Sequence, residues 1–294
     1  MKIAITGGTG FIGSNLVPEL ARRGHQVCLL TRKISIEKAA VKLPGLPALS
    51  CDSYEDVVTA LREFQPQMVI HLATTYVNKH TSEDIGRLCD SNISLGMNLL
   101  EAMRNCGICH ILNLGSRWQH LGPGKDTPAN LYAATKNAFQ EILAYYGSKH
   151  GLSFANIELC DTFGRGDTRK KIVQLIIDAC IGHKHLDLSP GGQILDLLCV
   201  EDVVDFISNK VEDLSFFGNG TIALSGEEVV LRELGNMVER LVGVDEYLHW
   251  GARPYRDDEV MVPPKFYTLL KINRHPLEYH LRKQYIDPQT IGGV

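Results

Sequence analysis

The sequence lacks the features that mark membrane-spanning, secreted or nucleic-acid-binding proteins. No apolar run in its 294 residues approaches the roughly 20 that a membrane span needs. The first apolar segment reaches glycine by Gly7, which is too soon for a signal peptide, so we expect a cytoplasmic protein. There is no long basic run and the net charge is −4, so neither a nucleic acid nor a membrane is indicated as a partner.

Clusters of metal ligands at recognisable spacing are also missing. The eight cysteines are scattered along the chain, and only Cys106 and Cys109 form a C-x-x-C pair. No second pair follows at zinc spacing, and this pair lies between a predicted helix and a predicted strand, whereas redox pairs favour a helix N-terminus. We therefore expect structural cysteines and no bound metal.

Short apolar strands alternate with amphipathic helices through the first two-thirds of the chain. This pattern is typical of an α/β fold in which helices cover both faces of a doubly wound parallel sheet. Strands are predicted at 2–6, 26–30, 48–51, 68–72, 110–114 and 153–159, and helices near 12–23, 53–64, 83–105 and 130–149. Later segments predict a helix near 169–182, a short strand pair at 186–188 and 194–198, and helices from about 201 and over 231–241.

Glycines follow the first predicted strand at once. Gly7, Gly10 and Gly13 form a G-x-x-G-x-x-G motif that opens the first helix. Such glycines permit a tight turn, close approach of a pyrophosphate to backbone N–H groups, and close packing of helix on strand. The motif indicates a dinucleotide-binding Rossmann domain, and a glycine-rich turn without a ligand is the alternative.

The end of the second strand bears on the choice of cofactor. An acid there would bond the ribose hydroxyl of NAD, but the strand runs into Thr31, Arg32 and Lys33. Arg32 offers a two-pronged contact to a phosphate, so we expect NADP(H). Asp52 follows the third strand and would accept a hydrogen bond from adenine or, alternatively, cap the next helix.

A tyrosine and a lysine lie four residues apart at the start of a predicted helix. This spacing places Tyr132 and Lys136 on one face. A free tyrosine has a pKa of about 10, and a nearby ammonium group favours the phenolate. The pair is therefore a candidate for proton transfer near neutral pH.

The glycine motif, the strand end at 71–73 and the Tyr132/Lys136 pair together resemble the extended short-chain dehydrogenase/reductase family, also called the NAD-dependent epimerase/dehydratase family. The resemblance covers roughly residues 1–210 and implies that Ser116 completes a Ser-Tyr-Lys set. It also implies cofactor contacts from the glycines and the neighbouring residues Phe11, Ile12, Thr31, Arg32, Asp52, Leu72, Ala73 and Lys136. Asn92 matches a position near the active site or is a plain helix-interior residue, and His71 is interpreted as structural.

Within that family the chain most resembles nucleotide-sugar 4-ketoreductases of CDP-linked 3,6-dideoxyhexoses, the paratose and abequose synthases. The likeness rests on GSRWQ at 115–119, NLYAATK at 130–136, DTFG at 161–164, DTRKK at 167–171, LSPGGQ at 188–193 and PYR at 254–256. It implies a role in deoxysugar and O-antigen biosynthesis and substrate contacts from Thr75, Trp118, Gln119, Asp161, Lys171, Gln193 and Arg256. Gly115-Ser116 stands where many relatives carry a Ser/Thr run, and Asp161 where many carry Asn, so both bear on which sugar binds.

These features lead to one functional hypothesis. We expect NADPH-dependent reduction of the 4-keto group of a nucleotide-linked 6-deoxy or 3,6-dideoxy sugar, in a homodimer formed through the helices near 83–105 and 130–149. The cofactor is expected on residues 1–160, a domain whose core continues to about 210, and the nucleotide sugar on a smaller lobe in 161–294. An NAD-dependent epimerase or dehydratase, a non-catalytic NADP-binding regulator and a reductase of another carbonyl remain alternatives.

Overall fold

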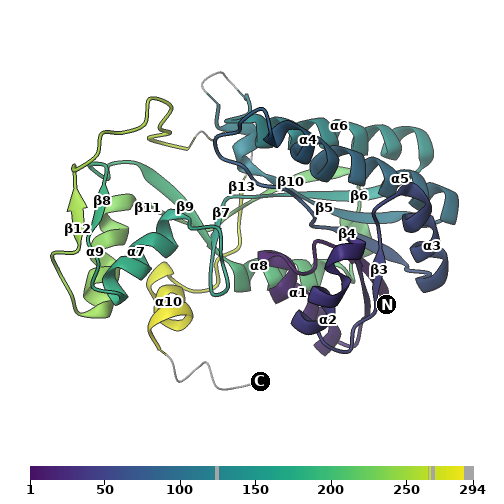
Figure 1. Cartoon of the computed structure of the whole chain (residues 1–294), viewed down its shortest axis with the longest axis horizontal. Coiled ribbons are helices and arrows are strands. Elements are labelled where there is room, and N and C mark those ends of the chain that lie inside the picture. The colour runs from purple at the N-terminus through teal and green to yellow at the C-terminus, as the bar shows by residue number, and fades with distance from the viewer. Residues whose placement is uncertain (123–125, 264, 266–268, 288–294) are drawn as a thin grey trace. The chain divides into compact units, whose positions relative to one another are not determined.

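The computed structural model describes residues 1–122, 126–263, 265 and 269–287 (Figure 1). The chain divides into two compact units. The first comprises Met1–Leu159 and Val204–Ala223, and the second comprises Cys160–Val203 and the residues from Leu224 onward.

A parallel sheet forms the centre of the first unit. Its strands lie in the order β3-β2-β1-β4-β5-β6-β10, followed at the edge by β13 (Leu269–Lys271). Every strand pair from β3 to β6 is parallel. The strands are β1 (Lys2–Thr6), β2 (Gln26–Thr31), β3 (Ala48–Ser50), β4 (Met68–His71), β5 (His110–Ser116), β6 (Ser153–Leu159) and β10 (Gly220–Ser225), the last of which runs on into the second unit. The order reverses between β1 and β4, and in such sheets ligands bind beyond the carboxyl ends of the strands at that reversal.

Helices cover both faces of this sheet, with α3, α5 and α6 on one face and α1 and α2 on the other (Figure 1). The doubly wound α/β fold predicted from the sequence is therefore confirmed. The helices are α1 (Phe11–Arg22), α2 (Ile36–Lys42), α3 (Tyr54–Phe64), α4 (Asp84–Cys89), α5 (Leu95–Cys106) and α6 (Leu131–His150), and α8 (Val200–Lys210) enters this unit at Val204. Short helical turns are η1 (Lys33–Ser35), η2 (Asp90–Ser94), η3 (Arg117–His120) and η4 (Leu214–Phe216).

Local sequence explains where the principal helices begin and end. The Ser53 hydroxyl accepts a hydrogen bond from Asp56 N, and the Asn130 side chain accepts one from Ala133 N, so both residues cap a helix. Gly107 and Gly151 end α5 and α6 in the left-handed conformation that glycine adopts without strain.

The helix predicted near 83–105 is interrupted. The π-helical turn η2 separates α4 from α5 and carries Asn92, whose side chain is only 1% exposed. Below this turn Gly96 packs against the ring of Phe139, and a Cβ at Gly96 would lie 2.2 Å from that ring. The interruption turns a polar side chain inward while the helices stay closely packed.

The second unit holds a separate apolar core between two small sheets and several helices. One sheet has the order β11-β9-β7 and the other pairs β12 with β8. Its elements are β7 (Asp161–Phe163), α7 (Ile172–Ile181), β8 (Leu186–Leu188), β9 (Ile194–Cys199), β11 (Glu227–Val230), α9 (Leu231–Val242), β12 (Leu248–Trp250), β13 (Leu269–Lys271), α10 (Leu277–Leu281) and the π-helical turn η5 (Arg282–Ile286).

The strand pair predicted at 186–188 and 194–198 is wrong. Both strands form, but β8 pairs with β12, and β9 pairs with β7 and β11. Between them Gly191 has a φ of +79° and lies so close to Trp250 that a Cβ would be 2.6 Å from the ring. This turn leads the chain away from a hairpin.

No helix among the described residues is long and apolar enough to cross a membrane.

Candidate active site

The loops that follow β1 and β4 meet at the reversal of strand order. Gly7 has a φ of +68°, and a Cβ there would lie 2.5 Å from Ala73 N. The Thr6 hydroxyl accepts a hydrogen bond from Ala73 N at 3.3 Å. The structure thus brings Gly7 together with Leu72 and Ala73, three of the residues expected to contact the cofactor.

The start of α1 fits a pyrophosphate. A Cβ on Gly13 would lie 2.4 Å from Gly7 O, so only glycine lets the helix approach the strand this closely. The helix begins at Phe11 after Gly10, with no side-chain cap and no acid in its first turn. The backbone N–H groups of Phe11, Ile12 and Gly13 therefore lie at the positive end of α1. No acidic side chain in the first turn offsets the positive charge there.

Arg32 follows β2 directly and is exposed. Asp52 lies beside it, and its carboxylate accepts a hydrogen bond from Lys33 N at 2.9 Å. The alternative that Asp52 caps α3 is wrong, because Ser53 fills that position. The end of β2 thus presents an arginine, with the nearest acid bonded to the backbone.

Ser116 ends β5 and caps the short helix η3. Its hydroxyl accepts a hydrogen bond from Trp118 N at 3.3 Å, and Gln119 Oε1 accepts one from Ser116 N at 2.8 Å, which completes a capping box. Gln119 is fully buried, and its amide donates to Asn137 and Gln140. Gln119 thus links the serine loop to α6, and its expected contact with the sugar stays a prediction.

Tyr132 and Lys136 lie on the first turns of α6 and are 8% and 4% exposed. Burial lowers the pKa of Lys136 to about 8. Burial is the sole cause of this shift, and no acid or hydrogen bond among the described residues offsets it. Burial and the charge of Lys136 together lower the pKa of His71 to about 3, so this imidazole is neutral, and its Nδ1 lies 2.7 Å from the Thr6 hydroxyl. His71 is thus structural, as expected.

Asn92 joins the loop after β4 to α6. Its Oδ1 accepts hydrogen bonds from Thr74 Oγ1 at 3.0 Å and Thr75 N at 2.7 Å, and its Nδ2 donates to Thr135 Oγ1 at 2.9 Å. Thr135 is the neighbour of Lys136, so Asn92 positions the helix that carries the catalytic candidates. Thr75, expected to contact substrate, is half-buried at this junction.

Tyr132 lies in a cluster of aromatic side chains that the sequence pattern did not indicate. The ring of Tyr76 lies edge-on to Tyr132 at 5.1 Å and to Trp118 at 6.1 Å. Trp118 is half-buried and packs in the same cluster. Tyr76 lies in an irregular loop after β4, where no periodicity points to it.

A buried acid near Ser116 was also missed. Glu158 on β6 is paired in register with Gly115, and its Oε2 lies 2.9 Å from His120 Nε2. The other ring nitrogen of His120 contacts Asp126. Burial disfavours the charge on His120, but the two carboxylates outweigh it and raise its pKa above the ordinary value.

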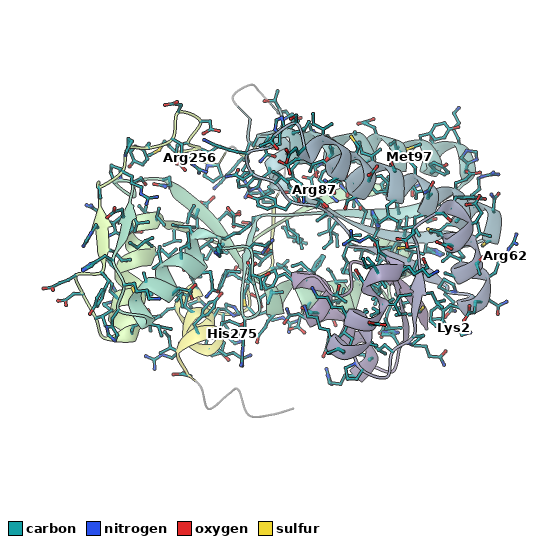
Figure 2. All side chains as sticks on the ribbon, viewed as in Figure 1. Lys2, Arg62, Arg87, Met97, Arg256 and His275 are labelled. Atoms are coloured by element: carbon teal, nitrogen blue, oxygen red, sulfur yellow. The ribbon has the colours of Figure 1, made fainter. Side chains whose placement is uncertain are left out.

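The remaining substrate candidates lie in the second unit. Lys171 Nζ is 2.7 Å from Asp161 Oδ1, so the fold brings these two together. Gln193 is 6% exposed, and its Nε2 donates to Ser189 Oγ at 3.3 Å. Arg256 is exposed (Figure 2) and forms two hydrogen bonds of 2.9 Å with Glu259.

Comparison with known proteins places the chain in a family. The profile of the "NAD dependent epimerase/dehydratase family" matches residues 3–218, so the chain belongs to that family. It is 32% identical to the CDP-abequose synthase of Yersinia pseudotuberculosis, over 90% of this chain and 92% of that one. It is 30% identical to the CDP-abequose synthase of Salmonella typhimurium strain LT2, over 88% and 87%.

Solved structures share the fold over the whole chain. The NAD complex of Thermus thermophilus UDP-glucose 4-epimerase superposes with a TM-score of 0.80 at 23% identity, covering 100% of both chains. A Bacillus cereus UDP-glucuronic acid 4-epimerase in complex with UDP-glucuronic acid and NAD gives a TM-score of 0.82 at 17% identity, covering 97% of this chain and 98% of that one.

Proposed function

We propose that the protein uses NADPH to reduce the 4-keto group of a nucleotide-linked 6-deoxy or 3,6-dideoxy hexose, with a CDP-linked sugar as the favoured substrate. The observation that carries the proposal is the buried Lys136 one helical turn from Tyr132, at the edge of the sheet where Ser116 ends β5. The two CDP-abequose synthases that align over most of the chain support the sugar class.

Ser116, Tyr132 and Lys136 would each have a different role in the reduction. NADPH, when bound, supplies a hydride to the carbonyl carbon. Tyr132 donates its phenolic proton to the carbonyl oxygen as negative charge develops there, and Ser116 donates a hydrogen bond to the same oxygen. Lys136 is still protonated at neutral pH, because burial lowers its pKa only to about 8. Its charge favours the phenolate and so makes Tyr132 a stronger acid.

The preference for NADPH rests on Arg32. Its guanidinium is exposed at the end of β2, and a bidentate contact with the 2′-phosphate is worth about 1.5–3 kcal/mol. Arg32→Ala is therefore expected to lower kcat/KM for NADPH by about 10- to 100-fold and to leave that for NADH nearly unchanged. An equal loss with both cofactors would refute this role for Arg32.

Each unit has its own proposed ligand. The first unit, with the glycine loop and Arg32, would bind the cofactor. The second unit would bind the nucleotide diphosphate of the sugar, with Lys171 and Arg256 as the cations that reach it. Asp161 and Gln193 supply hydrogen-bonding groups close to the sugar in this proposal.

A direct assay tests the function. Purified protein is mixed with NADPH and, separately, with CDP-, dTDP- and GDP-linked 4-keto-6-deoxy sugars, and oxidation of NADPH is followed by absorbance. NADH and the Tyr132→Phe variant are the controls. Turnover with one nucleotide series, preference for NADPH and collapse in Tyr132→Phe support the proposal.

Two other outcomes would replace it. Interconversion of a nucleotide sugar over tightly bound NAD, with no oxidation of NADPH, would make the protein an epimerase or dehydratase. Tight NADPH binding without turnover of any sugar would favour the non-catalytic regulator.

We also propose a homodimer formed through α4, α5 and α6. These helices expose the apolar side chains Ile85, Met97 and Tyr145 at 48%, 44% and 53% (Met97 is labelled in Figure 2). Light scattering after size exclusion is expected to give twice the chain mass, and Met97→Glu to give the monomer. A monomeric wild-type protein at assay concentration would refute this.

A further inference from the structure

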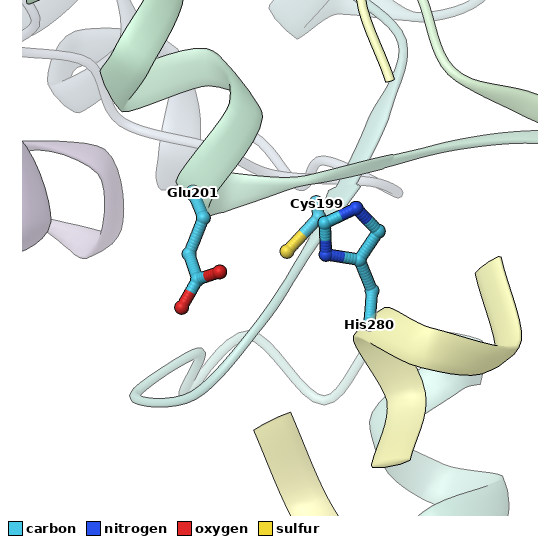
Figure 3. A group of neighbouring side chains, drawn as sticks. All are labelled: Cys199, Glu201 and His280. Atoms are coloured by element: carbon cyan, nitrogen blue, oxygen red, sulfur yellow. The ribbon is translucent and has the colours of Figure 1, made fainter. Parts of the chain in front are cut away.

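Three potential metal ligands, none of them among the residues of the proposed reductase site, come together in the second unit. Cys199 ends β9, Glu201 lies in the first turn of α8 and His280 lies on α10. One ligand atom from each, the thiol sulfur, a carboxylate oxygen and an imidazole nitrogen, lies within 4.8 Å of the others. Figure 3 shows the three side chains directed toward a common space.

The buried histidine is the observation that points to a ligand. His280 is 3% exposed, and its Nδ1 has no hydrogen-bond partner among the described residues. Its Nε2 lies 3.0 Å from Asp202 Oδ2, although the contact is not aligned as a hydrogen bond. A carboxylate behind a histidine is the usual arrangement when the other ring nitrogen binds a metal.

We propose that Cys199, Glu201 and His280 bind a divalent cation of the zinc class. Zinc takes thiolate, imidazole and carboxylate ligands with bonds of about 2.0–2.3 Å, which separates ligand atoms by about 3.3–3.8 Å. The ligand atoms lie within 4.8 Å of one another, an upper bound about 1 Å above that separation, so binding would require the side chains to move together by about this much. Water is the fourth ligand, and Asp202 orients His280.

Two features of the cluster shape the binding step. Cys199 is buried, and a thiol binds zinc as the thiolate, so binding would release the thiol proton to solvent. Lys283 Nζ lies 2.8 Å from Glu201 Oε2 and competes for the same carboxylate. Lys283 therefore opposes binding of the metal ion by Glu201.

The bound ion would link α10 to the end of β9 and the start of α8. Residues 199–201 and residue 280 are about 80 positions apart in the chain, which explains why no ligand spacing is visible in the sequence. This role is structural, and it is independent of hydride transfer in the first unit.

The test uses the full chain, stripped of metal with a chelator and titrated with Co²⁺ and Zn²⁺. We expect one Co²⁺ per chain with a thiolate-to-cobalt absorption band, displaced by Zn²⁺. Cys199→Ser should abolish the band. Cys180→Ser is the matched control, because Cys180 is a buried cysteine of the same unit outside the cluster, and it should keep the band.

Further variants separate binding from packing. Glu201→Gln, at a half-exposed position, should keep the band and weaken Zn²⁺ binding by about tenfold or more. Lys283→Gln should strengthen binding several-fold, whereas loss of a purely structural ion pair would not. No band in the wild type, a band that persists in Cys199→Ser, or unchanged affinity in both Glu201→Gln and Lys283→Gln would overturn the proposal.

Discussion

Replacing Lys136 by methionine is expected to stabilise the protein while abolishing its activity. The ammonium group is buried, has no acidic partner among the described residues, and has its pKa lowered from 10.5 to about 8. Burying an unpaired charge destabilises the folded state. Methionine keeps most of the aliphatic stem and removes the charge.

The magnitude follows from the pKa. A change from 10.5 to about 8 corresponds to about 3 kcal/mol at neutral pH. Relaxation of the pocket and water entry reduce this, so we expect Lys136→Met to raise the free energy of unfolding by about 1–3 kcal/mol. Lys149→Met, at an exposed position on the same helix, should change it by less than about 0.5 kcal/mol.

The pH dependence supplies an independent check. Between about pH 8 and pH 10.5 the unfolded chain holds a proton on Lys136 that the folded protein has lost. The stability of the wild type therefore rises with pH across this window relative to the variant, and the advantage of Lys136→Met shrinks. Urea unfolding of the cofactor-free proteins, followed by circular dichroism, measures both effects. A variant less stable than the wild type, or a difference that does not change with pH, would refute the reasoning.

Three further predictions test the surroundings. Asn92→Leu should lower stability by about 2–4 kcal/mol, because Thr75 N loses its acceptor and Thr135 Oγ1 loses the bond that it accepts from Asn92. Thermal and urea unfolding measure this, and a neutral effect contradicts it. Gly13→Ala should weaken NADPH binding at least about tenfold by fluorescence titration, whereas Gly86→Ala, with open space around it, should not. His120→Gln should destabilise the protein more at about pH 5.5 than at about pH 8, because a raised pKa stabilises only while the imidazole is protonated; equal effects would contradict it.

The sequence predicted those parts of the fold that local pattern determines. Each strand from β1 to β6 was found within a few residues, because a buried parallel strand is a short apolar run between turns. The second unit was harder. β8 pairs with β12, and β9 pairs with β11 as well as with β7; β11 and β12 come later in the chain and carry no pairing signal of their own. The short helix α2 was missed for the same lack of pattern.

For the site, the sequence indicated residue types but not what each side chain faces. Trp118 and Gln119 follow Ser116 closely in the sequence, and for that reason both were predicted to contact the substrate. In the structure Gln119 satisfies its amide within the chain, whereas Lys136 has no such partner. This difference between the two side chains depends on burial and partners that only the folded chain supplies.

The same reasoning ranks the cations of the second unit as phosphate ligands. Arg169 donates to both oxygens of Asp167, a carboxylate only 3% exposed, and to Thr162 O and Oγ1, so release would leave a buried charge unpaired. Lys171 and Arg256 form partly exposed pairs with Asp161 and Glu259, contacts worth at most about 1 kcal/mol. In the proposed function the diphosphate of the substrate, with its greater negative charge, would compete with these single carboxylates. In the proposed function Lys171 and Arg256 are therefore the better candidates to reach the diphosphate, whereas Arg169 is held by Asp167 and Thr162.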